Sequence, residues 1–245
     1  MLLLELVDTD TFRAERFMAC AAAATLGTLL QPLAYIGLPA LGLRILPLPR
    51  HVLHSDMTNS FFFWDEEYTN YMQETIVFGG GCFWCTEAVF LMIKGGQSVE
   101  PGYTGGNTVD PTDTDVYTGK TGHAEVVKIE YNPDQISLEE LLQVFFSTHD
   151  GTQLNRQGPD VGTMYRSAIF YTTERQREKA RHYIDVLNKN VTQRIVTEVV
   201  PLDKFYPAQD YHKNFYKSGN RPDYCELVID PKVDKVKNKF KSLLK

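Results

Sequence analysis

The sequence predicts an α+β fold, a two-layer α/β sandwich in which helices pack on a mixed β-sheet and long loops rich in glycine and proline connect them. Segments typical of strands and of helices alternate between residues 75 and 202, with glycine and proline between them. The composition, with 43% hydrophobic and 23% charged residues, is that of ordinary globular proteins. These observations indicate one organised domain, which we expect over residues 75–245.

The first strand and the first helix flank a run of three glycines. β-branched and aromatic residues that end in glycines predict a strand over 75–80. The segment 82–93 contains no glycine or proline and predicts a helix that ends before Gly95. Cys82 and Cys85 therefore lie in the first turn of the predicted helix.

The rest of the domain continues the alternation. Strand-like runs are found at 124–131, 166–172 and 195–202. Apolar stripes at helical spacing predict helices at 137–149, 173–189 and 232–245. The spacing of Ser137 and Glu140 predicts a capping box, and Thr173 is expected to cap the following helix.

The N-terminal part of the chain differs in composition from the domain. An uncharged apolar segment at 17–43 follows two arginines and is long enough to cross a bilayer, although two prolines interrupt it. We expect a leader over 1–49 that acts as a signal or membrane anchor, and a linker over 50–74. With such a leader the protein is anchored or exported, and without one it is cytoplasmic.

Composition and cysteine spacing exclude several classes of protein. A net charge of −6 and a pI near 5.5 argue against nucleic-acid binding, because no basic face is evident. The four cysteines are too few for a disulfide-stapled scaffold, and no second close Cys or His pair is available for zinc. We expect no metal and no cofactor, and the cysteines indicate thiol chemistry.

The position of Cys82 favours a reactive thiol. Unpaired N–H groups at the start of a helix stabilise an anion, so this thiol should ionise more easily than a free one. Phe83 and Trp84 offer an apolar wall beside the sulfur. A dinucleotide loop is excluded because Trp84 occupies the place of a required glycine. A C-x-x-C thiol-disulfide oxidoreductase with Cys85, or a buried inert cysteine, stays open on these residues alone.

Several separated motifs resemble the A-type peptide methionine sulfoxide reductases. GCFWC at 81–85 is followed, in the family's order, by GYTGG at 102–106, TGHAE at 121–125, HDGTQLNRQGPDVGTMYRS at 149–167, YPAQDYHKNFY at 206–216 and YC at 224–225. The resemblance implies a ferredoxin-like core and reduction of the S-epimer of methionine sulfoxide, free or in oxidised proteins, to methionine.

The resemblance also implies roles for individual residues. Cys82 corresponds to the nucleophile that attacks the sulfoxide sulfur, and Glu125 to the acid that protonates the sulfoxide oxygen. That acid needs a pKa raised by a poorly solvated pocket, since an ionised carboxylate has no proton to donate. The residues that correspond to substrate-binding groups are Phe83, Trp84, Asp160 and Tyr165.

Attack leaves a sulfenic acid on Cys82, and a second thiol converts it to a disulfide that thioredoxin reduces in this family. Cys225 matches a recycling cysteine and lies in a tail rich in glycine and proline. Cys85 lies three residues from Cys82, on the same face of the predicted helix. We favour Cys225 as the resolving thiol and keep Cys85 as the alternative. We also expect the protein to be a monomer that contacts a membrane only through residues 17–43.

The sequence departs from the family at one position of the site. The family has a tyrosine after Asn-Pro-Thr, whereas this chain has Asp113 in DPTDTDV at 110–116. A second carboxylate near Glu125 should raise the pKa values of both acids and of the Cys82 thiol. Either the loop turns Asp113 toward solvent and Tyr165 acts alone, or catalysis is weakened.

Overall fold

The computed structural model describes residues 73–218 and 223–245. The predicted leader over 1–49, and the predicted linker over 50–74 except for its last two residues, lie outside the described residues. Within the described part of the chain, none of the helices has the length and apolar character needed to span a membrane.

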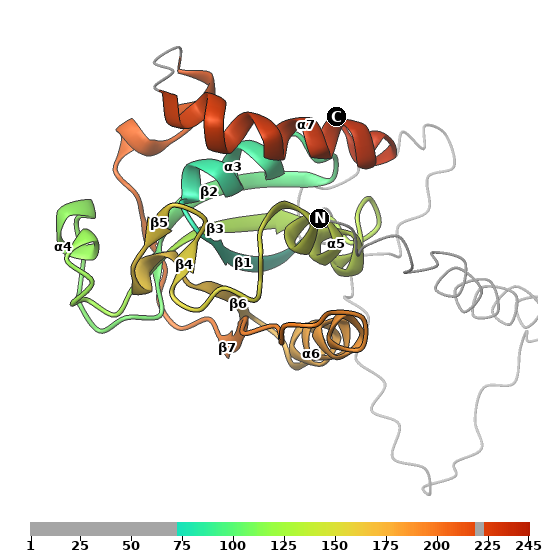
Figure 1. Ribbon diagram of the computed structural model, residues 1–245, viewed down its shortest axis with the longest axis horizontal. Coiled ribbons are helices and arrows are strands. Elements are labelled where there is room, and N and C mark those ends of the chain that lie inside the picture. Colours follow the sequence, from blue (N-terminus) through green and yellow to red (C-terminus); the bar gives the residue numbers. More distant parts are fainter. Residues whose placement is uncertain (1–72, 219–222) are drawn as a thin grey trace, which may run out of the picture. The chain divides into compact units, whose positions relative to one another are not determined.

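The centre of the fold is a six-stranded sheet. Its strands are β1 (Glu74–Gly80), β2 (Gly96–Thr104), β3 (Ala124–Tyr131), β6 (Ser167–Tyr171), β7 (Glu198–Pro201) and β8 (Tyr206–Pro207). Their order is β7-β6-β1-β3-β2-β8 (Figure 1). β6 and β7 run parallel, and all other neighbours run antiparallel, so the sheet is mixed as predicted.

The connections between the strands are those of a ferredoxin-like unit. α3 (Phe83–Phe90) follows β1, and α5 (Leu138–Thr148) follows β3, so the chain runs β-α-β-β-α-β from β1 to β6. The predicted α+β fold with a ferredoxin-like core is confirmed. After this core, α6 (Glu174–Asn188) leads into β7, which runs parallel to β6.

Alternate residues of the strands cover the two faces of the sheet. On one face, the ring of Phe78 stacks on Phe145 of α5 at 4.5 Å and contacts Phe90 of α3 at 5.4 Å. On the other face, Val77 and its neighbours pack against Leu202 and Phe205, which belong to the segment after β7. The helices therefore form one layer, and a loop covers part of the opposite face.

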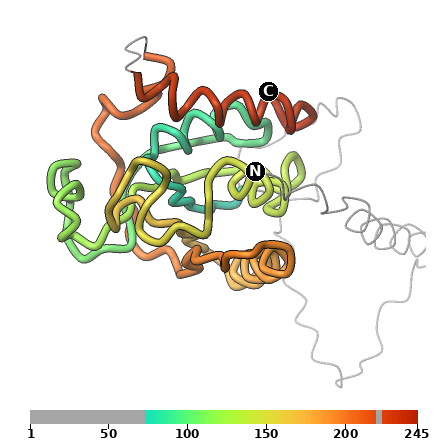
Figure 2. Tube along the Cα trace, viewed as in Figure 1, coloured from blue at the N-terminus to red at the C-terminus, as the bar shows by residue number. Residues whose placement is uncertain are grey.

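The C-terminal segment returns to the first helix of the domain. Figure 2 shows α7 (Asp230–Lys239), in red, running beside α3. Val233 and Val236 of α7 are buried, as the predicted apolar stripe requires. The return brings residues 225–229, a π-helical turn, into contact with α3, which carries Cys85.

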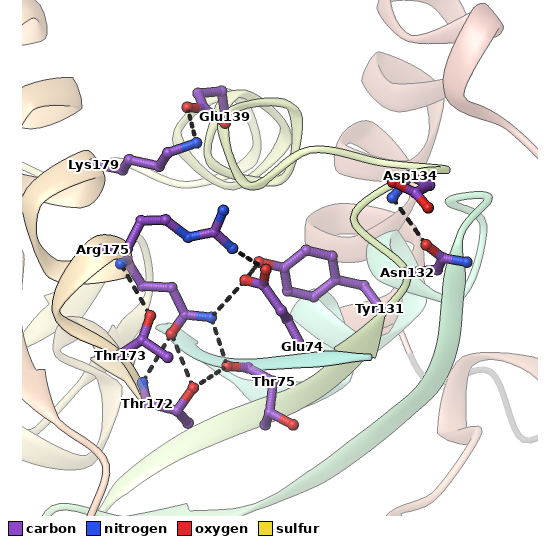
Figure 3. Close-up of polar contacts among 11 residues, drawn as sticks. Glu74, Thr75, Tyr131, Asn132, Asp134, Glu139, Thr172, Thr173, Arg175 and Lys179 are labelled. Atoms are coloured by element: carbon purple, nitrogen blue, oxygen red, sulfur yellow. Dashed lines mark hydrogen bonds and ion pairs between the residues drawn. The ribbon is translucent and has the colours of Figure 1, made fainter. Parts of the chain in front are cut away.

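A polar cluster joins the start of β1 to α6 (Figure 3). Glu74 accepts hydrogen bonds from the hydroxyl of Tyr131 at 2.8 Å and from the amide of Gln176 at 3.3 Å, and it pairs with Arg175. Lys179 of α6 pairs with Glu139 of α5 at 2.6 Å. These contacts fix the two helices to each other and to the sheet.

Most predicted elements are present, and the differences have local causes. The capping box of Ser137 and Glu140 is confirmed by reciprocal bonds of 3.2 and 2.8 Å, and Thr173 caps α6. The predicted helix over 82–93 ends at Phe90, because the chain then tightens into turns and the amide of Lys94 bonds to a C-terminal carbonyl.

Strand β2 was not predicted. Its sequence, GQSVEPGYT, contains two glycines and a proline, which are unfavourable in strands. The strand exists because it pairs with β3 along almost its whole length. The prediction over 195–202 was too long, since β7 begins only at Glu198.

Candidate active site

A tight turn places Cys82 at the start of α3. Gly81 has a φ of +90°, and a Cβ atom at this position would come within 2.6 Å of Gln157. Only glycine tolerates both the conformation and the close approach. Cys82 is the N-cap residue and is 8% exposed, so its sulfur lies just below the surface at the positive end of the helix.

The thiols of Cys82 and Cys85 lie close enough to shift each other's pKa. The Cys82 thiol and the charge of Lys232 lower the pKa of Cys85 to about 6, and the hydroxyl of Tyr224 lies 3.7 Å from the Cys85 sulfur. The Cys85 thiol, burial and the charge of Glu125 raise the pKa of Cys82. The two pKa shifts therefore run in opposite directions, and Cys85 is the thiol whose pKa falls.

The expectation that Cys82 ionises more easily than a free thiol is thus wrong for this arrangement. The backbone N–H of Trp84 does favour a Cys82 thiolate, as the helix start predicts. The effect is outweighed by the neighbouring Cys85 thiol, by burial and by the charge of Glu125.

Glu125 lies on β3 beside the start of α3. Its carboxylate accepts a hydrogen bond of 3.0 Å from the backbone N–H of Phe83. Burial, and then the charges of Asp160 and Cys85, raise the pKa of Glu125 to about 8 despite that bond. The carboxyl therefore keeps its proton at neutral pH, which is what a proton donor requires.

Two tyrosines lie near this carboxyl. Tyr103 of β2 is the direct cross-strand partner of Glu125 and is almost fully buried. Tyr165 lies at the end of a 3₁₀ turn, Thr163–Tyr165. Burial and the nearby charges of Glu125 and Cys82 raise the pKa values of both phenols, so both hydroxyls remain donors.

The C-terminal segment contributes a further tyrosine. The hydroxyl of Tyr224 donates to Asp160 at 2.7 Å and lies next to the sulfur of Cys85. Asp160 itself lies in the two-stranded hairpin of β4 (Arg156–Gln157) and β5 (Asp160–Val161). Cys225 follows Tyr224 in the chain and is completely buried at the start of the π-helical turn.

Aromatic rings line the site next to the thiols. The indole of Trp84 stacks on Phe215 with ring centres 3.7 Å apart and an angle of 7°. Phe83 contacts Tyr103 at 5.6 Å and the ring of His212 at 4.9 Å. These rings form the apolar wall expected from Phe83 and Trp84.

Asp113, which replaces the tyrosine of the family, begins α4 (Asp113–Tyr117). The hydroxyl of Tyr211 and the backbone N–H of Thr114 stabilise its carboxylate and lower its pKa. The expectation of a raised pKa for Asp113 is therefore wrong, although its charge adds slightly to the rise at Glu125. The side chain is 41% exposed and is directed toward His212.

The structure brings together the predicted groups Cys82, Phe83, Trp84, Cys85, Glu125, Asp160 and Tyr165. Tyr103, His212 and Tyr224 also lie at the site, although the sequence predicted no role for them. All three lie within the family motifs quoted above, and their place in those motifs could have marked them as site residues. Their contacts depend on β2 and on the C-terminal return, which the sequence did not predict.

Among the described residues, the three cysteines are thiols, and no cluster of three His, Cys, Asp or Glu side chains could hold a metal ion. The arrangement contains two neighbouring thiols, a carboxyl whose pKa is raised, phenolic hydroxyls and several aromatic rings.

Comparison with known proteins agrees with this chemistry. The family model described as peptide methionine sulfoxide reductase matches residues 74–244. The enzyme MsrA of Picrophilus torridus is 51% identical over 170 residues, which is 69% of this chain and 96% of that protein. The MsrA of Acinetobacter baumannii strain AYE is 51% identical over 174 residues, 71% of this chain and 99% of that protein.

Solved structures give the same result. Methionine sulfoxide reductase A of Corynebacterium diphtheriae is 34% identical with a TM-score of 0.59, covering 60% of this chain and 76% of that chain. Mxr1 of Saccharomyces cerevisiae in reduced form is 29% identical with a TM-score of 0.58, covering 62% and 88%. The chain belongs to the peptide methionine sulfoxide reductase family.

Proposed function

We propose that Cys82, Glu125 and Cys85 divide the reduction of methionine sulfoxide among them as nucleophile, acid and base. Reduction of this substrate to methionine by thiol chemistry is the reaction of the family to which the chain belongs. The observation that carries the assignment is Glu125, whose carboxyl has a pKa of about 8 and accepts the N–H of Phe83, next to Cys82.

The first step forms the sulfenic acid. The sulfur of Cys82 attacks the sulfoxide sulfur, and its proton passes to the thiolate of Cys85. Glu125 donates its proton to the sulfoxide oxygen. The hydroxyl group then moves from the substrate sulfur to the sulfur of Cys82. The substrate S–O bond and the transient bond between the two sulfurs break, and methionine leaves with Cys82–SOH formed. The sulfoxide is reduced by two electrons, and Cys82 is oxidised by two.

The second step forms a disulfide. We assign this step to Cys85, since its thiol interacts with that of Cys82 and has the lowered pKa. The thiol of Cys85 displaces the hydroxyl of the sulfenic acid as water, and the S–S bond closes across the C-x-x-C segment. Cys225 stays the alternative, because it lies directly after Tyr224, which contacts Cys85.

A dithiol then returns the disulfide to two thiols, and thioredoxin is the reductant that the family resemblance implies. The roles of Phe83 and Trp84 in holding the substrate's methyl group, and of Asp160 and Tyr165 around its oxygen, belong to the same proposal. The leader over 1–49 stays a prediction, which N-terminal sequencing of the protein from cells tests.

The assignment is tested with single turnovers in the absence of reductant. Wild-type protein should release about one methionine per chain. Cys82→Ser should form methionine at less than about a thousandth of the wild-type rate. Peptide mapping by mass spectrometry then identifies the disulfide. A bond between Cys82 and Cys85 in both the wild type and Cys225→Ser supports the proposal.

Two outcomes contradict it. A wild-type bond between Cys82 and Cys225, with normal thioredoxin-dependent turnover in Cys85→Ser, would assign the resolving role to Cys225. Disulfide exchange without release of methionine would instead indicate a general thiol-disulfide oxidoreductase.

A further inference from the structure

We infer that Asp113 is a positioning residue, whose carboxylate keeps the proton of His212 on Nε2 and so leaves Nδ1 to hold the indole of Trp84. The inference rests on the proposed role of Trp84 in binding the methyl group of the substrate. It assigns a task to the residue at which this chain departs from its family.

The first contact in this chain of groups is between two aromatic side chains. The indole nitrogen of Trp84 lies 3.2 Å from Nδ1 of His212. An indole N–H can only donate, so Nδ1 must be the accepting, unprotonated nitrogen. In a neutral imidazole the proton then lies on Nε2.

The second contact is between that Nε2–H and Asp113. The carboxylate oxygen of Asp113 lies 3.6 Å from Nε2 of His212. This is an electrostatic contact rather than a short hydrogen bond, and in the described part of the chain the buried Nε2 has no closer polar partner. The carboxylate is therefore the group that stabilises the Nε2–H form.

The surroundings of His212 keep the ring neutral. Burial lowers the pKa of His212, and the charge of Asp113 opposes this effect only in part. The other groups around the ring are Phe83 and Trp84 from α3, and Tyr211, whose ring centre is 4.2 Å away. Tyr211 donates to Asp113, so its hydroxyl also holds the carboxylate in place.

The consequence concerns the orientation of Trp84. Phe215 covers one face of the indole at 3.7 Å, and His212 holds its N–H edge. Two perpendicular contacts leave the ring little freedom to rotate. Loss of the Asp113 contact should loosen His212 and then Trp84, and should weaken substrate binding more than it slows the chemical step.

A first experiment reads the protonation of His212 without any substrate. Long-range ¹H–¹⁵N NMR of the full ¹⁵N-labelled chain reports which ring nitrogen carries the proton, and His212→Gln identifies the signal among the six histidines. We expect the Nε2–H form in the wild type. In Asp113→Ala and Asp113→Asn the pKa of His212 should fall by about one unit, because a neighbouring negative charge is lost.

A second experiment separates binding from catalysis. In Asp113→Ala the substrate concentration for half-maximal single-turnover rate should rise about threefold, as expected for the loss of one electrostatic contact at a partly exposed carboxylate. The limiting rate should stay within about twofold of wild type. Asp113→Asn keeps a carbonyl dipole near Nε2–H, so it should bind substrate more tightly than Asp113→Ala and less tightly than the wild type.

Asp210→Asn is the matched control. Asp210 lies two residues from His212 and is paired with Lys213, so its substitution removes the same charge without touching the ring. It should change neither the pKa of His212 nor substrate binding.

An Nδ1–H form in the wild type, an unchanged pKa in Asp113→Ala, or an equal effect of Asp210→Asn would overturn the inference. If the wild type releases no methionine, the proposed function is contradicted instead. The NMR result does not depend on methionine release and tests the inference separately.

Discussion

Two glutamate and tyrosine pairs lie at opposite ends of β3, on the same face of the sheet, and they perform different tasks. Glu74 of β1 is the cross-strand partner of Tyr131 of β3. Glu125 of β3 is the cross-strand partner of Tyr103 of β2. Residues 125 and 131 are separated by an even number of positions, so their side chains share a face. Each pair also meets the first turn of a helix.

The neighbours of the two carboxylates differ in number and in charge. Glu74 receives donors from Tyr131 and Gln176 and pairs with the cation of Arg175. Glu125 receives the single backbone N–H of Phe83 and lies among the negative groups Asp160 and Cys85. Glu74 therefore joins elements of the fold, whereas Glu125 holds a proton. The difference shows that surroundings, rather than residue type or strand pairing, decide which carboxyl is reactive.

The largest effect is expected from Glu125→Gln. The amide matches the carboxyl in shape but cannot donate an acidic proton, so the single-turnover rate of methionine formation should fall about a hundredfold or more. Rapid-quench measurement of methionine checks this. Glu74→Gln is the matched control, and its rate should stay within about twofold of wild type. Equal losses in both variants would mean that Glu125 acts through the fold and not as an acid.

A smaller effect is expected from pH. Glu125 must be protonated to donate, so the single-turnover rate should fall about tenfold per unit above pH 8, where its raised pKa lies. Cys85 must be ionised to accept the proton of Cys82, so the rate should also fall below about pH 6.

The two limbs of this profile can be assigned separately. Glu125→Gln should lose the alkaline limb, and Cys85→Ser the acidic limb. A profile that keeps both limbs in both variants would contradict the assignment of acid and base.

The smallest effect is expected at the structural pair. Glu74→Gln loses the charge that pairs with Arg175 and weakens the bond from Tyr131 (Figure 3). Because the Arg175 side chain is 62% exposed, we expect the free energy of unfolding to fall by only about 1 kcal/mol. Urea denaturation followed by circular dichroism measures it. A change above about 3 kcal/mol would show that this cluster has a larger role in the fold.

Much of the fold could be predicted from the sequence because the signals are local. The capping box of Ser137 and Glu140 acts within one helical turn, and the alternation over 124–131 follows from the strand period. The identity of the site was also carried by local motifs around Cys82 and Glu125. In each case residues close in sequence were sufficient for the prediction.

The sequence by itself determined which residues are candidates for the site, and only the tertiary structure decided which charges and donors surround each of them. The spacing of Cys82 and Cys85 predicts a thiol pair, but besides Cys82 it is Lys232, from the C-terminal segment, whose charge lowers the pKa of Cys85. Likewise, the sequence shows only that Asp113 replaces the tyrosine of the family, whereas the structure shows that its carboxylate lies beside His212. Electrostatic interactions depend on distance in space, and strand β2 and the C-terminal return bring together groups that are far apart in the chain.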